Sequence, residues 1–135
     1  MAPALLMAST QSLIRSLVHT NADVSRILAV ANSMLANDTA DDRFVTLLLA
    51  KLDYNSRRLS FASAGHPSGY VLDASGALKA CLESSALPLS VLAENEFPVS
   101  EPMELASGDL ILLLTDGVLE AGALQGEGFG DRRVL

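Results

Sequence analysis

The first third of the chain repeats apolar residues at intervals of three and four, which is the spacing of one face of a helix. This pattern predicts an amphipathic helix from about Pro3 to about His19. Its stripe consists of Leu6, Thr10, Leu13, Ile14, Leu17 and Val18.

A second amphipathic helix is predicted to follow at once. Asn21 is a plausible N-cap, Asp23 falls in the predicted first turn, where the helix dipole favours a negative charge, and Asn37 and Asp38 end the helix. Its stripe consists of Val24, Ile27, Leu28, Ala31, Met34 and Leu35. We expect the two helices to pack side by side against a sheet, with a common set of buried residues, namely Leu13, Leu17, Ile27, Leu35, Leu47 and Leu49.

From Phe44 onward the pattern is typical of β-structure, with apolar segments separated by loops rich in turn-forming residues. Helices followed by successive antiparallel hairpins indicate an α+β fold, in which two amphipathic helices pack on one or more antiparallel β-sheets. Three hairpins are predicted: residues 44–52 with 59–64, 69–72 with 78–82, and 96–105 with 110–115.

Thr115-Asp116-Gly117 directly follows five aliphatic residues, Leu110 to Leu114. Such a run predicts a strand covered on both faces, and its end would place the Asp116 carboxylate at the rim of a sheet, where it could bind a metal ion. The alternative is an ordinary turn, in which Asp116 caps backbone amides and Gly117 takes a positive φ.

Several segments, in this order, resemble the SpoIIE and RsbU-type branch of the bacterial metal-dependent (PPM) serine/threonine protein phosphatases. The resemblance covers nearly the whole chain and implies a partial PPM-phosphatase α-β-β-α sandwich. The segments are Phe44 to Asp53, Arg58 to Pro67, Gly108 to Ala121 and Gly128-Phe129-Gly130, and the most specific parts are Ala64-Gly65-His66-Pro67 and Thr115-Asp116-Gly117-Val118.

The resemblance implies roles for four residues. Asp116, with Gly117, matches the metal-binding motif of the family, whose cations are Mn²⁺ or Mg²⁺, and hard cations of this kind prefer oxygen ligands. Gly65 and His66 match a substrate or active-site loop. His66 could hydrogen-bond a metal-bound water or the substrate phosphate, or it could only orient the loop by bonding a backbone carbonyl.

The chain also departs from the family pattern. It lacks the early Gly-Asp-x-x-Asp segment, the following Asp-x-x-Gly-His-Gly segment and the late aspartate of the dinuclear metal centre. Because one carboxylate cannot hold two cations, residues 1–135 are expected to be an internal part of a phosphatase domain that is inactive on its own. Glycines of the family pattern are replaced by Ala86 and Ser90, which predicts a stiffer loop there.

Charge and composition narrow the possible partners. A net charge of −7 disfavours nucleic acid and suits either cations or a solvated acidic surface. No apolar run is long enough to span a membrane and no signal-like segment opens the chain, so a cytoplasmic location is expected. The lone Cys81 is expected to pack as a small hydrophobic residue.

Two functions therefore compete. The first is a metal-dependent phosphatase acting on a phosphoserine or phosphothreonine regulatory protein, such as an anti-anti-sigma-like protein. The alternative is a non-catalytic PPM-like module that binds a partner protein, while a small-molecule-binding β-domain has only the hairpins in its favour. Sheet edges left open in a partial domain predict a homo-oligomer.

Overall fold

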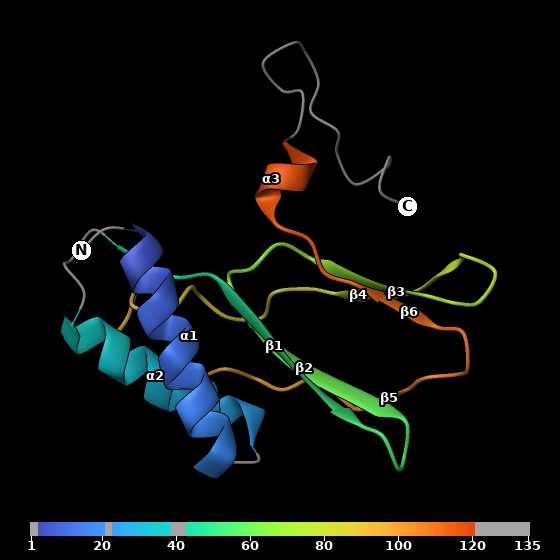
Figure 1. Ribbon diagram of the computed structural model, residues 1–135, viewed down its shortest axis with the longest axis horizontal. Coiled ribbons are helices and arrows are strands. Elements are labelled where there is room, and N and C mark those ends of the chain that lie inside the picture. The colour runs from blue at the N-terminus through green and yellow to red at the C-terminus, as the bar shows by residue number, and fades with distance from the viewer. Residues whose placement is uncertain (1–2, 21–22, 39–42, 121–135) are drawn as a thin grey trace. The chain divides into compact units, whose positions relative to one another are not determined.

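A computed structural model describes residues 3–20, 23–38 and 43–120 of the chain. Its element order is that of an α+β fold, as the sequence predicts (Figure 1). The elements are α1 (Pro3–Thr20), α2 (Val24–Asp38), β1 (Leu47–Asp53), β2 (Arg58–Ala64), β3 (Gly69–Leu72), β4 (Leu78–Leu82), β5 (Met103–Glu104), β6 (Leu110–Leu112) and α3 (Asp116–Leu119).

The chain forms two compact units, each with its own three-stranded antiparallel sheet. The first unit spans Met1–His66 and Ser84–Glu104 and holds the sheet β1-β2-β5; the second spans Pro67–Glu83 and Leu105–Leu135 and holds the sheet β4-β3-β6. The first two predicted hairpins are confirmed as β1–β2 and β3–β4. The third is wrong, because β5 pairs with β2 whereas β6 pairs with β3.

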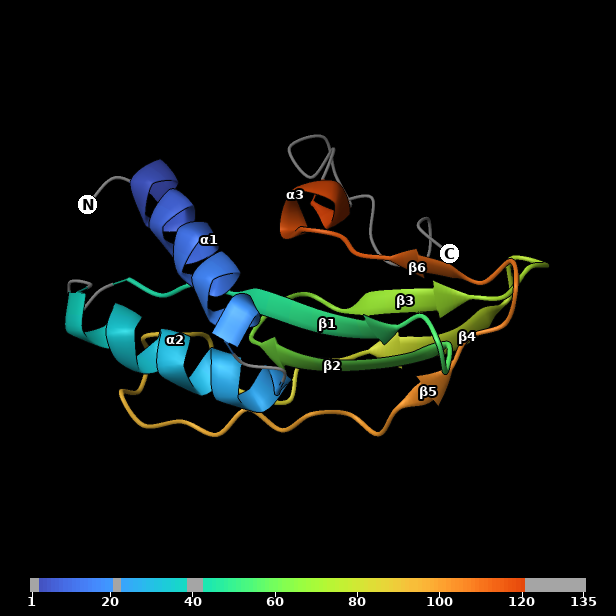
Figure 2. The same ribbon diagram turned by 60° about the horizontal axis from the view of Figure 1, so that its bottom comes forward.

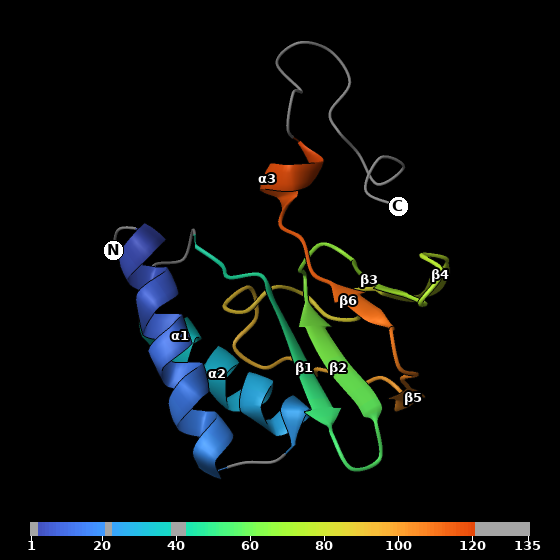
Figure 3. The same ribbon diagram turned by 45° about the vertical axis from the view of Figure 1, so that its right-hand side comes forward.

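Helix α2 supplies most of the core of the first unit. It lies against β1 and β2, and α1 lies alongside it (Figure 3). The register pairs Leu47 with Ala64 and Leu49 with Ala62, so these side chains share the sheet face that meets the helices. The buried core of this unit consists of Leu6, Val24, Leu28, Leu35, Ala62, Ala64, Leu89 and Phe97.

Burial of the two helical stripes agrees with prediction for α2 and less well for α1. On α2, all the predicted stripe residues except Met34 are buried. On α1 only Leu6 and Thr10 are buried, and Val18 is exposed, whereas Leu13 and Leu17 are half-buried. Helix α1 therefore contributes the N-terminal end of its apolar stripe to the core, whereas the C-terminal end lies at the surface.

The start of α2 differs from the prediction. The Oδ1 atom of Asp23 accepts hydrogen bonds from the amides of Ser25 (2.9 Å) and Arg26 (3.4 Å), and Asp23 precedes the first helical residue. Asp23 is therefore the capping residue and not a member of the first turn, because its short carboxylate reaches the amides that the helix leaves unpaired. Asn21 lies outside the described residues.

In the second unit the two edge strands are more exposed than predicted. Leu110 is 54% exposed and Leu113 is 49% exposed, so the expectation of a strand covered on both faces is wrong. Among the described residues of this unit, strand β6 pairs with β3 alone and the one helix is the four-residue α3. Cys81 is also exposed, because on the edge strand β4 the alternation that buries Leu82 turns its neighbour outward.

The start of β6 is tied to β4 by an ion pair. Lys79 donates from Nζ to the Oδ2 atom of Asp109, and the same oxygen accepts the amide of Ala106 at 2.9 Å. These two hydrogen bonds, the Lys79 bond first, hold the pKa of the Asp109 carboxyl below its ordinary value. The contact bridges the two edge strands across β3.

Candidate functional site

The Gly65–His66 turn begins where β2 ends, and its geometry requires glycine. Gly65 has φ +64°, in the left-handed region that side chains disfavour. A Cβ atom at this position would lie 2.4 Å from Cγ of Pro88, well inside contact distance. Both the backbone conformation and the close approach of the Pro88 ring therefore exclude a larger residue.

A short segment from Ser84 to Pro88 supports this turn. The amide of Gly65 donates to Oγ of Ser84 (2.7 Å) and to the carbonyl of Ala86 (2.9 Å). The Ser84 hydroxyl in turn donates to the carbonyl of Ser63 at 3.1 Å. The backbone leaving β2 is therefore held from one side by hydrogen bonds and by a proline ring.

Among the described residues, the partner of the His66 imidazole is a side chain, whereas the sequence also allowed a backbone carbonyl. Its Nδ1 atom lies 3.3 Å from Oγ1 of Thr46, which precedes β1, and the tautomer decides which of the two atoms donates. The ring is half-buried. With Nδ1 oriented by Thr46, Nε2 is the nitrogen through which His66 could contact a ligand.

Asp116 and Gly117 open α3 in the second unit. The Asp116 side chain is exposed and its Oδ1 atom accepts the amide of Gly117 at 2.9 Å, while Thr115 before it is extended. Gly117 is not among the glycines with positive φ, so the alternative of a turn that needs a left-handed glycine is wrong. The carboxylate instead lies at the first residue of a single helical turn.

The described residues do not form a complete metal centre. Within residues 3–20, 23–38 and 43–120, no three His, Cys, Asp or Glu side chains are grouped so that they could hold a metal ion. Asp116 offers one carboxylate, whereas a site for hard cations needs several oxygen ligands. The family-like residues Ala121 and 128–130 lie outside the described part of the chain. Gly65 and His66 belong to the first unit and Asp116 and Gly117 to the second, so each pair is described within its own unit.

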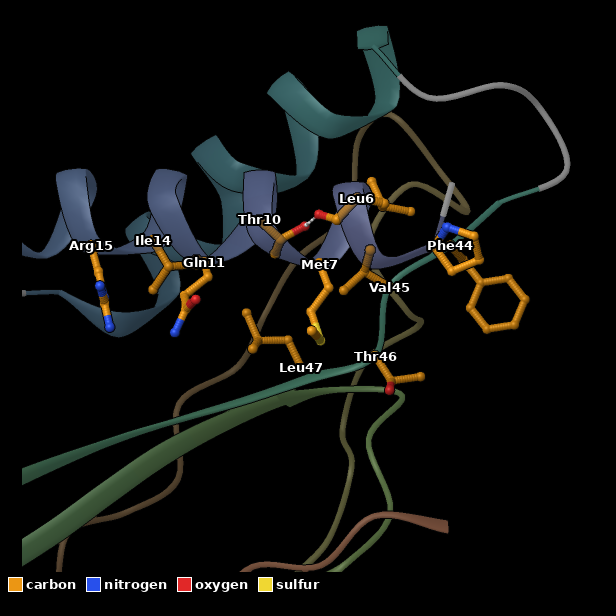
Figure 4. A pocket seen from close by; sticks show the side chains of 11 residues that line it. Leu6, Met7, Thr10, Gln11, Ile14, Arg15, Phe44, Val45, Thr46 and Leu47 are labelled. Atoms are coloured by element: carbon orange, nitrogen blue, oxygen red, sulfur yellow. Dashed lines mark hydrogen bonds between the residues drawn. The ribbon is translucent and has the colours of Figure 1, made fainter. Parts of the chain in front are cut away.

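A groove of about 550 Å³ lies between α1 and the segment that leads into β1 (Figure 4). The Thr10 hydroxyl within it is already bonded to the carbonyl of Leu6 at 2.8 Å, and Met7 and Phe44 at its border are 70% and 59% exposed. Its composition suits an apolar partner better than acid–base chemistry. The lining residues are Pro3, Leu6, Met7, Thr10, Gln11, Ile14, Arg15, Phe44, Val45, Thr46 and Leu47.

Sequence reasoning missed one buried polar residue, which bonds the loop that follows the Ser84–Pro88 segment. Asn32 lies within the apolar face of α2, is only 1% exposed, and bonds the loop that contains Ser90. An amide side chain inside a helical stripe, four residues after Leu28 and three before Leu35, was the available signal. Polar groups at such positions have specific partners when buried.

None of the helices in the described part of the chain combines the length and apolarity needed to cross a membrane.

Comparison with curated proteins finds relatives that are longer than this chain. It is 26% identical over 117 residues to phosphoserine phosphatase RsbU of Bacillus subtilis (strain 168), covering 87% of this chain and 35% of that protein. It is 26% identical over 113 residues to stage II sporulation protein E of Priestia megaterium, covering 84% and 19%. The chain thus spans about a third or less of the length of these relatives.

Solved structures agree with the observed fold. The RsbU and RsbW domains of a Mycobacterium tuberculosis protein match with a TM-score of 0.74 and 25% identity, over 87% of this chain and 32% of that one. The phosphatase domain of SpoIIE from Bacillus subtilis matches with a TM-score of 0.50 and 23% identity, over 82% and 48%, which is a likeness of fold. The family model of stage II sporulation protein E (SpoIIE) matches residues 1–135, and the chain therefore belongs to the SpoIIE family.

Proposed function

We propose that this chain is part of a cytoplasmic, metal-dependent phosphatase domain that dephosphorylates a phosphoserine or phosphothreonine regulatory protein. The observation that carries this proposal is the match of the whole chain to the SpoIIE family, with relatives that include a protein named phosphoserine phosphatase. An anti-anti-sigma-like protein is the substrate class that the family resemblance suggests.

Four residues are assigned roles within this proposal. Asp116, with the adjoining Gly117, would contribute to binding Mn²⁺ or Mg²⁺, which supplies charge stabilisation for phosphoryl transfer to water. Gly65 and His66 would form the loop that meets the phosphoprotein. Within the structure, Gly65 and His66 are held in place by the close approach of Pro88 to Gly65 and by the contact between Thr46 and His66. Because the described residues group no further ligands with Asp116, we expect the 135-residue chain to be inactive by itself.

A non-catalytic, protein-binding module is the second candidate. The apolar groove beside α1, with Met7 and Phe44 exposed at its border, favours this alternative. The same exposed residues, together with the edge strands β4 and β6, support the further proposal that the chain self-associates in solution.

Phosphatase assays on two proteins separate these functions: the 135-residue chain, and the chain extended by the sequence that adjoins it in its gene. Each is assayed with p-nitrophenyl phosphate and a phosphoserine peptide in excess Mn²⁺ or Mg²⁺. We expect no turnover by the chain alone and metal-dependent turnover by the extended protein. Asp116→Asn should abolish that turnover, and the exposed Glu83→Gln in the same unit should leave it unchanged.

A folded extended protein that neither binds Mn²⁺ in calorimetry nor hydrolyses either substrate would refute the phosphatase proposal and favour the binding module. Turnover by the 135-residue chain that disappears in Asp116→Asn would instead show that the expected inactivity is wrong.

A further inference from the structure

Asn32 uses its buried side chain to hold a loop that is some sixty residues away in the sequence. Its Nδ2 atom donates to the carbonyls of Leu92 (2.8 Å) and Ala93 (3.0 Å), and its Oδ1 atom accepts the amide of Ser90 (2.9 Å). Both amide protons and one oxygen lone pair are therefore used. The chain leading towards β5 is in this way attached to α2, beside which it runs in Figure 2.

The loop is held in a conformation that it would not favour by itself. Ser90 has φ +72°, a region that glycine occupies easily and serine does not. The amide of Ser90 donates its hydrogen bond to the Oδ1 atom of Asn32. A strained residue persists only where its surroundings fix it, and here the Asn32 amide is one of the groups that do so.

The segment that contains Ser90 also meets the Gly65–His66 turn, through Pro88, which lies two residues before Ser90. Leu89 is fully buried and exchanges two backbone hydrogen bonds with Val45, at 2.8 and 3.0 Å. Pro88, which precedes Leu89, places its ring where a Cβ atom on Gly65 would lie, 2.4 Å from the Pro88 Cγ atom. A continuous path of direct contacts therefore runs from the Asn32 amide through Ser90, Leu89 and Pro88 to Gly65.

We propose that Asn32 is a positioning residue for the Gly65–His66 turn, acting through the segment from Ser84 to Ala93. The meaning of this role for catalysis rests on the proposed function, because it assumes that the turn meets the substrate. The structural coupling between Asn32 and the turn does not depend on that assumption. A purely local role of Asn32, in which it only satisfies the backbone groups of its own loop, would leave the turn unaffected when the side chain is removed.

Amide hydrogen exchange of the 135-residue chain, followed by NMR, distinguishes these two roles. Asn32→Ala should speed exchange at Ser90 and at Gly65 by about 10- to 100-fold relative to the β1–β2 ladder, as loss of buried hydrogen bonds implies. Pro88→Ala removes the ring but leaves the Asn32 bonds, so it should loosen Gly65 and spare Ser90. Side-chain resonances of His66 should shift in both variants.

Ile27→Ala is the matched control, because Ile27 is buried on the same helix but does not belong to the core cluster that contains Leu89 of the loop segment. It should speed all protected amides together, whereas Asn32→Ala should act selectively. If Asn32→Ala does not fold, wild-type exchange in rising urea gives the same test: Ser90 and Gly65 should share one opening event below global unfolding. Pro88→Ala supplies a second test in that case.

Gly65 protection that stays at the wild-type level in Asn32→Ala, or wild-type Ser90 and Gly65 amides that open independently, would overturn the inference. None of these readouts requires turnover, so a failure of the phosphatase proposal leaves them intact. If the extended protein is active, Asn32→Ala should also lower its kcat/KM, while Ser33→Ala on the exposed side of α2 should not.

Discussion

Replacing Ser90 by glycine should stabilise the protein, although it removes a side chain from a loop beside the core. Two unfavourable features coincide at this residue. Its φ of +72° costs an L-residue about 1–2 kcal/mol. Its Oγ atom is buried and has no hydrogen-bond partner among the described residues, and an unpaired buried hydroxyl costs about 1–3 kcal/mol.

The expected gain follows from comparing these costs with the entropy of glycine. Ser90→Gly removes both the strain and the orphan hydroxyl and keeps the amide that donates to Asn32. The added freedom of glycine in the unfolded chain offsets about 0.5–1 kcal/mol. Taking the low end of each cost, the free energy of unfolding should rise by about 1–1.5 kcal/mol. For a chain of this size that corresponds to a rise in Tm of roughly 3–8 °C.

Urea unfolding followed by circular dichroism measures the change, and two variants separate its causes. Ser90→Ala removes the hydroxyl but keeps the strained backbone, so it should give only part of the gain. Arg57→Gly relieves a positive φ of 53° at an exposed turn with no buried group, so it should change stability by less than Ser90→Gly. A lower urea midpoint for Ser90→Gly, with an unchanged slope, would refute the reasoning.

Three further predictions concern the core, the acid stability and the surface. Leu28 is 0% exposed in the core of the first unit, so Leu28→Ala should lower the free energy of unfolding by about 2–5 kcal/mol. A smaller decrease in urea unfolding would contradict the central position of Leu28. The Lys79 hydrogen bond keeps the pKa of the Asp109 carboxyl below its ordinary value of 3.8. The ionised Asp109 therefore stabilises the folded protein above about pH 4, and this stabilisation is lost as the pH falls through the lowered pKa of the folded state. Asp109→Asn should therefore lose less stability than wild type between about pH 6 and pH 3, and equal losses would contradict the role of the ion pair. Light scattering at micromolar concentration should detect self-association of the wild-type chain, and the double variant Met7→Ser, Phe44→Ser should weaken it. A wild-type chain that is monomeric would disprove the proposed self-association.

The parts of the fold that the sequence predicted are those in which short-range patterns decide the structure. The stripe of α2 and the loop after Asp53 specify their elements locally, since Asp53 itself accepts the amides of Asn55 and Ser56 in the turn. The third hairpin failed for the opposite reason. Met103 pairs with Leu59, more than forty residues earlier, and no local pattern distinguishes that pairing from one with β6.

Burial was harder to predict than secondary structure. Cys81 and Leu110 are apolar residues in apolar strands, yet both are exposed because their strands lie at sheet edges. Hydrophobicity indicates which residues can be buried, whereas topology decides which of them find a covering layer. Asn32 is the reverse case: a polar residue is almost fully buried because three backbone groups of a distant loop satisfy it.

The two motifs that suggested a phosphatase differ in how firmly the described residues hold them. Gly65 receives two hydrogen-bond acceptors and a proline ring from a segment that Asn32 anchors, so the first motif is positioned by the packing of its own unit. Among the described residues, the Asp116 side chain has one hydrogen bond, from the amide of Gly117, and it is exposed at the start of a four-residue helix. Catalytic groups need support from packed neighbours to hold a productive geometry. Within the described residues only the first motif has such support.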